Sequence, residues 1–387
     1  MRIVIVSRIF TPEPAAASFL LHATAEAFAE AGHEVEVLTT TVPAGPAARP
    51  LTGVRVRRAP VKRDRQGYVR GYVSYLSFDI PVFFRLMFSR RADVYLVEPP
   101  PTTGAVVRVA SALRRTPYVY DAADLWSDAA GVVTSSSFVL GALRWVERFA
   151  MRGAAHAFAI SQGLIDRMRQ IGIATPATAV GFGTDVSAFR YSPQPPPVDP
   201  HFVYGGSYSE WHGAEVFVEA FADVQRVYPG ARLTFVGNGS EQPRLRELAA
   251  GLGLSGVEFL EPVAPETLAE MLSAATASLA SLRPNAGYDY AFTTKVYASL
   301  VSGCPVIFSG TGPTGPFLRG ESAHHPVGAA VEWSAEAAAS AMLAAADAPL
   351  PEPSRKALAD WAAARFSLRA VAGRIVAGTE AVVASER

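Results

Sequence analysis

The sequence is poor in residues that characterise several classes of protein. Cys304 is the only cysteine among 387 residues, so no disulfide can form within the chain. Such cysteine usage is typical of proteins in a reducing compartment, and we expect a cytoplasmic protein. The seven histidines show no metal-ligand spacing of the His-Glu-x-x-His or Cys/His type. We therefore expect neither a metal nor another cofactor.

An excess of one charge and a long apolar run are also missing. Lys+Arg and Asp+Glu number 35 each, whereas a nucleic-acid-binding protein usually carries a basic excess. We expect no nucleic-acid partner. No stretch reaches the ~18 uninterrupted apolar residues that a membrane-spanning helix needs. The apolar start of the chain is interrupted by Arg8 and fits a buried parallel strand better than a secretory signal.

What the chain does have is apolar material for two cores, since half of its residues are hydrophobic. The first half begins with a short apolar run, which is followed by an Ala-rich helix at 19–31, Gly32 and a second apolar run. This order predicts βαβ units and a parallel sheet. The strands expected here are 3–6, 34–39, 54–57, 94–97, 118–120 and 157–160.

The second half repeats this alternation of strands and helices. A Gly-rich loop follows each of its first two strands, at 205–207 and 237–239. The expected strands are 201–204, 232–236, 257–260, 278–282 and 305–308. We expect no further clear strand after 305–308. The expected helices are 214–228, 241–251, 265–275 and 292–302.

A proline-rich segment at 191–200 separates the two halves. Proline neither joins a sheet interior nor continues a helix, so we expect an extended linker there. The predicted domains are 1–190 and 201–365, and the terminal helix at about 366–387 is expected to pack back onto the first domain. The predicted fold is α/β, with two Rossmann-like, doubly wound parallel-sheet domains facing a central cleft.

Several segments, in this order, resemble a known family. They are "RIFTPEPAAASFLLHATAEAFAEAGHEVEVLT", "PPPTTGAVVRVASALRRTPYVYDAADLWSDAA", "GFGTD", "LTFVGNGSEQPRLRELAAGLGLSGVEFLEPV" and "FTTKVYASLVSGCPVI". Together they resemble the retaining glycosyltransferases of the GT-B fold, family 4, of the bacterial polysaccharide and glycolipid type. The resemblance implies transfer of a sugar from a nucleotide-diphosphate donor to a glycan or lipid-linked acceptor, with retention and without a metal.

The sequence departs from that family at four places. After the Gly-rich loop at 205–207 the family's Arg and Lys are missing, and Ser209 and His212 stand nearby instead. Ala15, Ala16 and Ala17 stand where the family has Gly-Gly, Ala298 replaces its ribose-binding Glu, and Ala123 replaces a His. The donor site is therefore atypical. These departures motivate an alternative function, a catalytically degenerate GT-B subunit that supports a partner transferase.

Candidate donor-binding residues follow the strands of the second half. Backbone N–H groups at Gly205, Gly206 and Ser207 would bind phosphate, or these glycines only form a tight turn. Lys295 and Arg283 would place two cations on a diphosphate, unless Lys295 reaches solvent and Arg283 pairs with a carboxylate.

Further residues would complete the donor site. Thr294 and, as an imidazolium, His212 would add phosphate contacts. Gly237 and Asn238 would approach the nucleotide, or form a plain turn. Asp289, with Tyr290 beside it, would bind the ribose hydroxyls, although an Asx turn or helix cap explains Asp289 equally well.

Candidate acceptor-binding residues lie in the first half. Asp124 would orient the sugar or acceptor, or else cap the segment that follows it. Trp126 would stack on a sugar ring, unless it is simply buried. Ala16 and Ala17 occupy the position of the family's Gly-Gly loop. The aromatic segment 70–91, flanked by arginines, is either a buried helix pair or a peripheral membrane contact at the inner face of the membrane.

Overall fold

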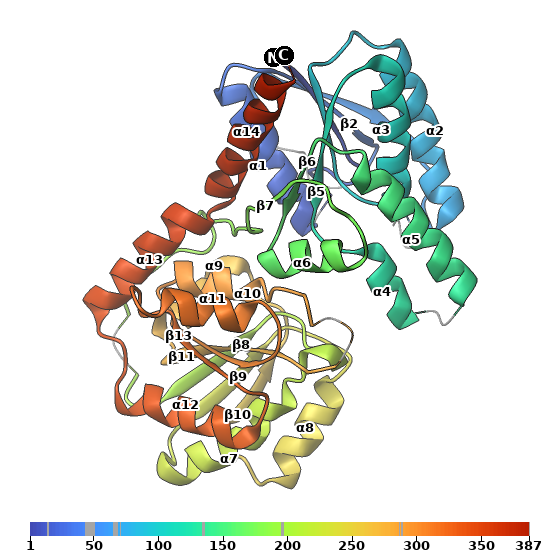
Figure 1. The fold of residues 1–387 in the computed structure, drawn as a ribbon. Coiled ribbons are helices and arrows are strands. Elements are labelled where there is room, and N and C mark those ends of the chain that lie inside the picture. Colours follow the sequence, from blue (N-terminus) through green and yellow to red (C-terminus); the bar gives the residue numbers. More distant parts are fainter. Residues whose placement is uncertain are drawn as a thin grey trace. The chain divides into compact units, whose positions relative to one another are not determined.

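The computed structural model describes residues 1–13, 15–42, 51–64, 69, 71–133, 136–194, 197–285, 287 and 289–386. The chain divides into two compact units, Met1–Phe182 with Leu368–Arg387 (unit 1) and Gly183–Ser367 (unit 2). Each unit is built around one parallel sheet, as Figure 1 shows. The predicted α/β class with two Rossmann-like domains is confirmed. Along the described chain, no helix is both long and apolar enough to span a membrane.

The sheet of unit 1 has seven strands in the order β3-β2-β1-β4-β5-β6-β7. Its order reverses between β1 and β4, and in open α/β sheets this point at the carboxyl ends of the strands is where ligands bind. Every residue of β1, β4 and β5 is buried, as expected for a sheet covered on both faces. The strands are Arg2–Val6 (β1), Glu34–Thr40 (β2), Val54–Ala59 (β3), Val94–Val97 (β4), Tyr118–Ala122 (β5), His156–Ala159 (β6) and Ala177–Ala179 (β7).

Helices cover both faces of this sheet. α1 packs against α14, and α3 packs between α2 and α5 (Figure 1). Gly104 on α3 allows close packing, because a β-carbon there would lie 2.7 Å from the Tyr120 ring on β5. The helices are Ala16–Glu30 (α1), Tyr72–Phe88 (α2), Pro101–Arg114 (α3), Trp126–Val133 (α4), Ser137–Arg152 (α5), Gln162–Gln170 (α6) and Leu368–Ser385 (α14).

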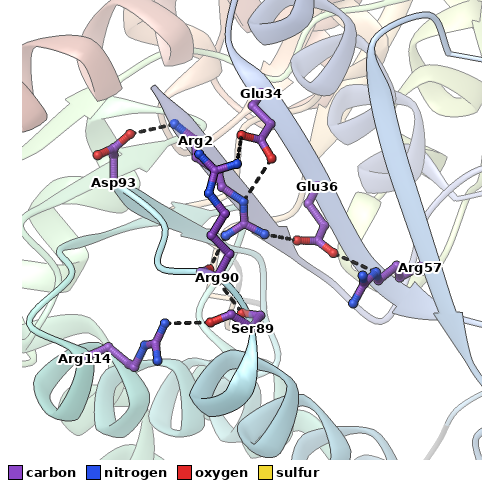
Figure 2. A network of polar contacts seen from close by, with 8 residues as sticks. All are labelled: Arg2, Glu34, Glu36, Arg57, Ser89, Arg90, Asp93 and Arg114. Atoms are coloured by element: carbon purple, nitrogen blue, oxygen red, sulfur yellow. Dashed lines mark hydrogen bonds and ion pairs between the residues drawn. The ribbon is translucent and has the colours of Figure 1, made fainter.

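An ion-pair network joins the amino ends of β1 and β2 (Figure 2). Arg2 is buried and pairs with both Glu34 and the buried Glu36. Glu34 also binds Arg90, and Glu36 binds Arg57, at 2.9 Å each. Two charges buried together need such mutual pairing, since either one alone would retain its full desolvation cost.

The sheet of unit 2 has six strands in the order β10-β9-β8-β11-β12-β13. They are His201–Gly205 (β8), Arg232–Val236 (β9), Val257–Leu260 (β10), Ala277–Leu282 (β11), Val306–Gly310 (β12) and Gly328–Val331 (β13). The helices are Glu215–Val227 (α7), Gln242–Gly251 (α8), Pro265–Ala274 (α9), Lys295–Val301 (α10), Thr314–Glu321 (α11), Ala335–Asp347 (α12) and Glu352–Phe366 (α13), with a 3₁₀ turn at Glu210–His212 (η1).

Two expectations for unit 2 need correction. The helix expected at 292–302 begins at Lys295, and Phe292 is instead buried with its ring 4.9 Å from that of Tyr297. The strand near 306–310 is not the last one, because β13 follows it. The sequence of β13 is Gly-Ala-Ala-Val, which has little strand propensity of its own, so its pairing with β12 makes it a strand.

Candidate functional site

The Gly-rich turn after β8 lies at the carboxyl end of the unit 2 sheet. Gly206 has a φ of 109°, a backbone conformation that favours glycine. The chain then makes η1 before it enters α7 at Glu215, one residue after the predicted start at 214. The phosphate-binding role of Gly205, Gly206 and Ser207 stays a prediction.

The second glycine loop packs on the first. A β-carbon on Gly237 would lie 2.2 Å from the carbonyl oxygen of Gly206, and one on Gly239 would lie 2.0 Å from that of Tyr208. The Tyr208 hydroxyl donates a hydrogen bond of 2.7 Å to the Gly237 carbonyl. These glycines are therefore needed for contact between two loops. The exposed Asn238 between them is still a candidate nucleotide contact.

Lys295 lies beside the first turn. Its Nζ atom is 3.9 Å from the centroid of the Tyr204 ring and donates a hydrogen bond of 3.3 Å to the Ser207 carbonyl. A β-carbon on Gly206 would lie 3.8 Å from the same nitrogen. Burial lowers the pKa of this ammonium to about 7. No carboxylate of the described residues forms an ion pair with it, so its charge is available to an anion.

His212 adjoins the same turn but is not the expected imidazolium. Its Nδ1 accepts a hydrogen bond of 3.0 Å from the Ser209 N–H. Burial, together with the charge of Lys295, lowers the His212 pKa to about 3. The ring is therefore neutral near pH 7. With Nδ1 as acceptor the proton is on Nε2, which leaves His212 as a neutral hydrogen-bond donor.

Arg283 follows β11 and pairs with a carboxylate. Its Nη2 contacts the buried Glu215 at the start of α7. The guanidinium carbon is 5.5 Å from the centroid of the Trp333 ring. The sequence left two roles open for Arg283, and the structure shows the ion pair with a carboxylate. Glu215 offsets much of the charge that Arg283 would offer to a diphosphate.

The residues before α10 form a turn. Oδ1 of the exposed Asp289 accepts a hydrogen bond of 3.0 Å from the Asn285 N–H, so the carboxylate closes a local turn. Tyr290 and Thr294 both precede α10, and Thr294 is exposed without a side-chain capping bond. The predicted nucleotide and phosphate contacts of these residues remain predictions.

Arg8 is a cation at the carboxyl end of the unit 1 sheet, two residues after the end of β1. It is buried, and its guanidinium carbon lies 4.0 Å from the centroid of the Tyr75 ring and 5.7 Å from that of Trp126. Its Nε has no hydrogen-bond partner. Trp126 therefore packs on Arg8 and Tyr75, but it is not fully buried and still presents surface to a ligand.

Two buried carboxyl groups lie at the ends of neighbouring strands. Glu98 follows β4 and accepts a hydrogen bond of 2.8 Å from the Ser7 hydroxyl. Burial raises its pKa to about 8, and the charge of Asp121 on β5 adds to the increase. Burial likewise raises the Asp121 pKa to about 7. Glu98 was not predicted from the sequence, although its position directly after a buried strand, where the strand order reverses, was a usable signal.

Asp124 does not cap the helix that follows it. Glu147 of α5 does so, since its Oε1 accepts a hydrogen bond of 2.7 Å from the Trp126 N–H. Asp124 is an exposed residue and its carboxylate is not occupied in capping, although partial desolvation of that carboxylate raises its pKa to about 6. Ala16 begins α1 and Ala17 is half-buried on its first turn. The roles of these three residues in acceptor binding stay predictions.

Two protein-family models match the chain. The model described as "Glycosyl transferase 4-like domain" matches residues 19–183, and that described as "Glycosyl transferases group 1" matches residues 199–347. The matches fall on the sheets of unit 1 and unit 2 respectively. No curated protein matches the sequence.

Solved structures show the same fold at low sequence identity. Sucrose-phosphate synthase from Thermosynechococcus elongatus is 19% identical over 100% of both chains, with a TM-score of 0.74. HepE of Anabaena in complex with UDP is 17% identical, covering 98% of this chain and 100% of that one, with a TM-score of 0.68. WaaG, a glycosyltransferase involved in lipopolysaccharide biosynthesis, is 17% identical over 97% and 100%, with a TM-score of 0.63. These structures share the fold of the chain, which is of the GT-B type. The two family models identify the chain as a glycosyltransferase, with a glycosyl transferase 4-like domain followed by a group 1 domain.

Proposed function

We propose that the protein transfers a sugar from a nucleoside-diphosphate donor to a glycan or lipid-linked acceptor in the cytoplasm, with retention and without a metal. The observation that carries this proposal is Lys295, a cation without a carboxylate partner among the described residues, beside the Gly206 turn. HepE, a protein of the same fold, has been solved with UDP and with UDP-glucose.

In this proposal unit 2 holds the donor. The ammonium of Lys295 and the Nε2–H of His212 bind the diphosphate oxygens, so the charge on the leaving group is stabilised as it develops. The anomeric carbon loses its bond to the phosphate oxygen and forms one to the acceptor oxygen on the same face. The proton of the acceptor hydroxyl passes to the departing phosphate oxygen.

Unit 1 would bind the acceptor. Trp126 stacks on a sugar ring, and Asp124 accepts a hydrogen bond from an acceptor hydroxyl and so orients it. The leaving phosphate takes the proton, so neither Glu98 nor Asp121, at the carboxyl end of the unit 1 sheet, is needed as a base. The alternative, a catalytically degenerate subunit, was motivated by Ala298 and Ala123 in place of the family's Glu and His. The described residues of the site add no second observation in its favour.

A thermal-shift panel with UDP, GDP, ADP, TDP and CDP, each with and without magnesium, tests donor binding. A ligand at 100 times its dissociation constant stabilises the fold by about 2.7 kcal/mol. We expect one nucleotide to raise the melting temperature equally with and without magnesium. Lys295→Ala should remove this response, whereas Lys356→Ala, which changes an exposed lysine of α13, should keep it. If no nucleotide stabilises the protein, the proposal is wrong.

A further inference from the structure

Helix α2 carries apolar side chains on its exposed face as well as on its buried one. At 100° per residue the exposed residues lie within an arc of about 120°, so they form one stripe along the helix. Phe88 at its end is 84% exposed, and its ring stacks on that of Phe84. The residues of the stripe are Val73, Leu76, Ile80, Phe84 and Phe88.

The neighbouring helices extend this surface. α3 packs against both α2 and α5, and the three lie side by side in Figure 1. α3 exposes Val109 and Leu113, and α5 exposes Phe138, Val139 and Trp145. We call these five residues, together with the α2 stripe, the apolar face. It holds ten of the fourteen large apolar side chains exposed among the described residues, and such clustering marks an interaction surface.

The charges of these three helices have one sign at the surface. Their two acidic residues, Asp79 and Glu147, are each 1% exposed and engage Thr103 and Ser127. Their other charged residues are arginines: Arg85, Arg108, Arg114, Arg144, Arg148 and Arg152.

More arginines follow the ends of α2 and α3. Arg114 donates hydrogen bonds to the Met87 and Ser89 carbonyls and so joins these two ends, with the Ser89 bond visible in Figure 2. Arg91 and Arg115 are exposed beside this junction, and Arg91 donates to the Arg115 carbonyl. Basic side chains therefore border the apolar face near Phe88 and Leu113.

We propose that the apolar face of unit 1 docks on a lipid bilayer whose headgroups are anionic. Aromatic and aliphatic side chains enter the boundary between headgroups and acyl chains, while the bordering arginines contact lipid phosphates. A second copy of the chain fits less well, because a two-fold interface would bring these arginines together with no exposed carboxylate on the three helices to pair them. Docking would make a lipid-linked acceptor accessible, and this last consequence alone rests on the proposed sugar transfer.

Vesicle co-sedimentation of the full chain tests the docking. The probes are phosphatidylcholine vesicles, pure or with about 30% phosphatidylglycerol, at low and high salt. We expect binding to the anionic vesicles only, weakened by salt. Phe84→Ser with Phe88→Ser should reduce binding at least tenfold. The matched control is Val227→Ser with Leu252→Ser, which changes exposed apolar residues of unit 2 and should bind like the wild type.

Two further measurements separate the alternatives. Lipids brominated on the acyl chain should quench tryptophan fluorescence, and Trp145→Phe should remove most of this quenching. Absence of vesicle binding, or equal binding by the Phe84 and Phe88 variant, would overturn the proposal. Concentration-dependent dimerisation that this variant abolishes would assign the face to a second copy instead. Nucleotide-induced stabilisation reports on unit 2, so failure of docking and failure of the proposed function are distinguishable.

Discussion

The ammonium of Lys295 lies 3.9 Å from the centroid of the Tyr204 ring. The ring face attracts the cation, but it solvates the ammonium less well than water does, and burial lowers the Lys295 pKa to about 7. The group is thus poised between two charge states near neutral pH. A bound diphosphate would favour the charged state, and so couple nucleotide binding to proton uptake.

Nucleotide affinity should therefore fall as pH rises above 7. The anion binds the protonated Lys295, whose fraction decreases about tenfold per pH unit above its pKa. The affinity of the nucleotide that stabilises the protein should fall by up to about fiftyfold between pH 7 and 9, as the protonated fraction of Lys295 does. Isothermal titration calorimetry in two buffers of different ionisation enthalpy measures the affinity and the proton uptake. Lys295→Met should bind weakly and without a pH slope, and a flat wild-type profile would contradict the assignment.

Arg283→Ala should lower stability as well as any activity. The substitution leaves the buried Glu215 carboxylate without its closest cation, which costs about 3 kcal/mol. The double variant Arg283→Ala with Glu215→Gln should recover part of this loss, as chemical denaturation would show. If Arg283→Ala alone leaves the free energy of unfolding unchanged, the ion pair contributes nothing to the fold.

Gly237→Ala should destabilise unit 2 by at least about 2 kcal/mol. Its β-carbon would lie 2.2 Å from the Gly206 carbonyl oxygen, and its φ of 136° disfavours any side chain. Gly251→Ala is the matched control, since no atom lies within 4 Å of its β-carbon. That change at the end of α8 should be neutral, or stabilising by about 0.5 kcal/mol. Similar melting temperatures for the two variants would refute the close loop contact.

Glu98→Gln should stabilise the protein at alkaline pH. Burial raises the Glu98 pKa to about 8 from its ordinary value of 4.5, so the folded state binds a proton that the unfolded chain releases. Wild-type stability therefore falls through this group as pH rises from about 4.5 to 8. The variant lacks this loss and should be more stable at pH 8 by about 1–3 kcal/mol, with no such gain at pH 4.

Glu258→Gln, which changes an exposed carboxylate on β10, is the control for Glu98→Gln. Its melting temperature should follow that of the wild type from pH 4 to 8. An equal gain in stability for Glu98→Gln at pH 4 and at pH 8 would mean that folding does not raise the pKa of the Glu98 carboxyl group.

Much of the fold followed from the sequence. The strands at 94–97, 232–236 and 257–260 agree with the prediction to the residue, because each is a short apolar run bounded by loop residues. β7 and β13 were not predicted, since Ala-Thr-Ala and Gly-Ala-Ala-Val carry no strand signal of their own. Their neighbours in the sheet decide their conformation.

The sequence by itself determined the parallel-sheet units, the glycine turns and Lys295 as a candidate cation, because these are local properties of short segments. Only the tertiary structure decided that Glu215 pairs with Arg283, and that Glu147, not Asp124, caps α4. It also decided that burial keeps His212 neutral and Glu98 protonated near pH 7. Pairing and desolvation depend on which distant segments pack together, and this information is absent from the spacing of residues along the chain.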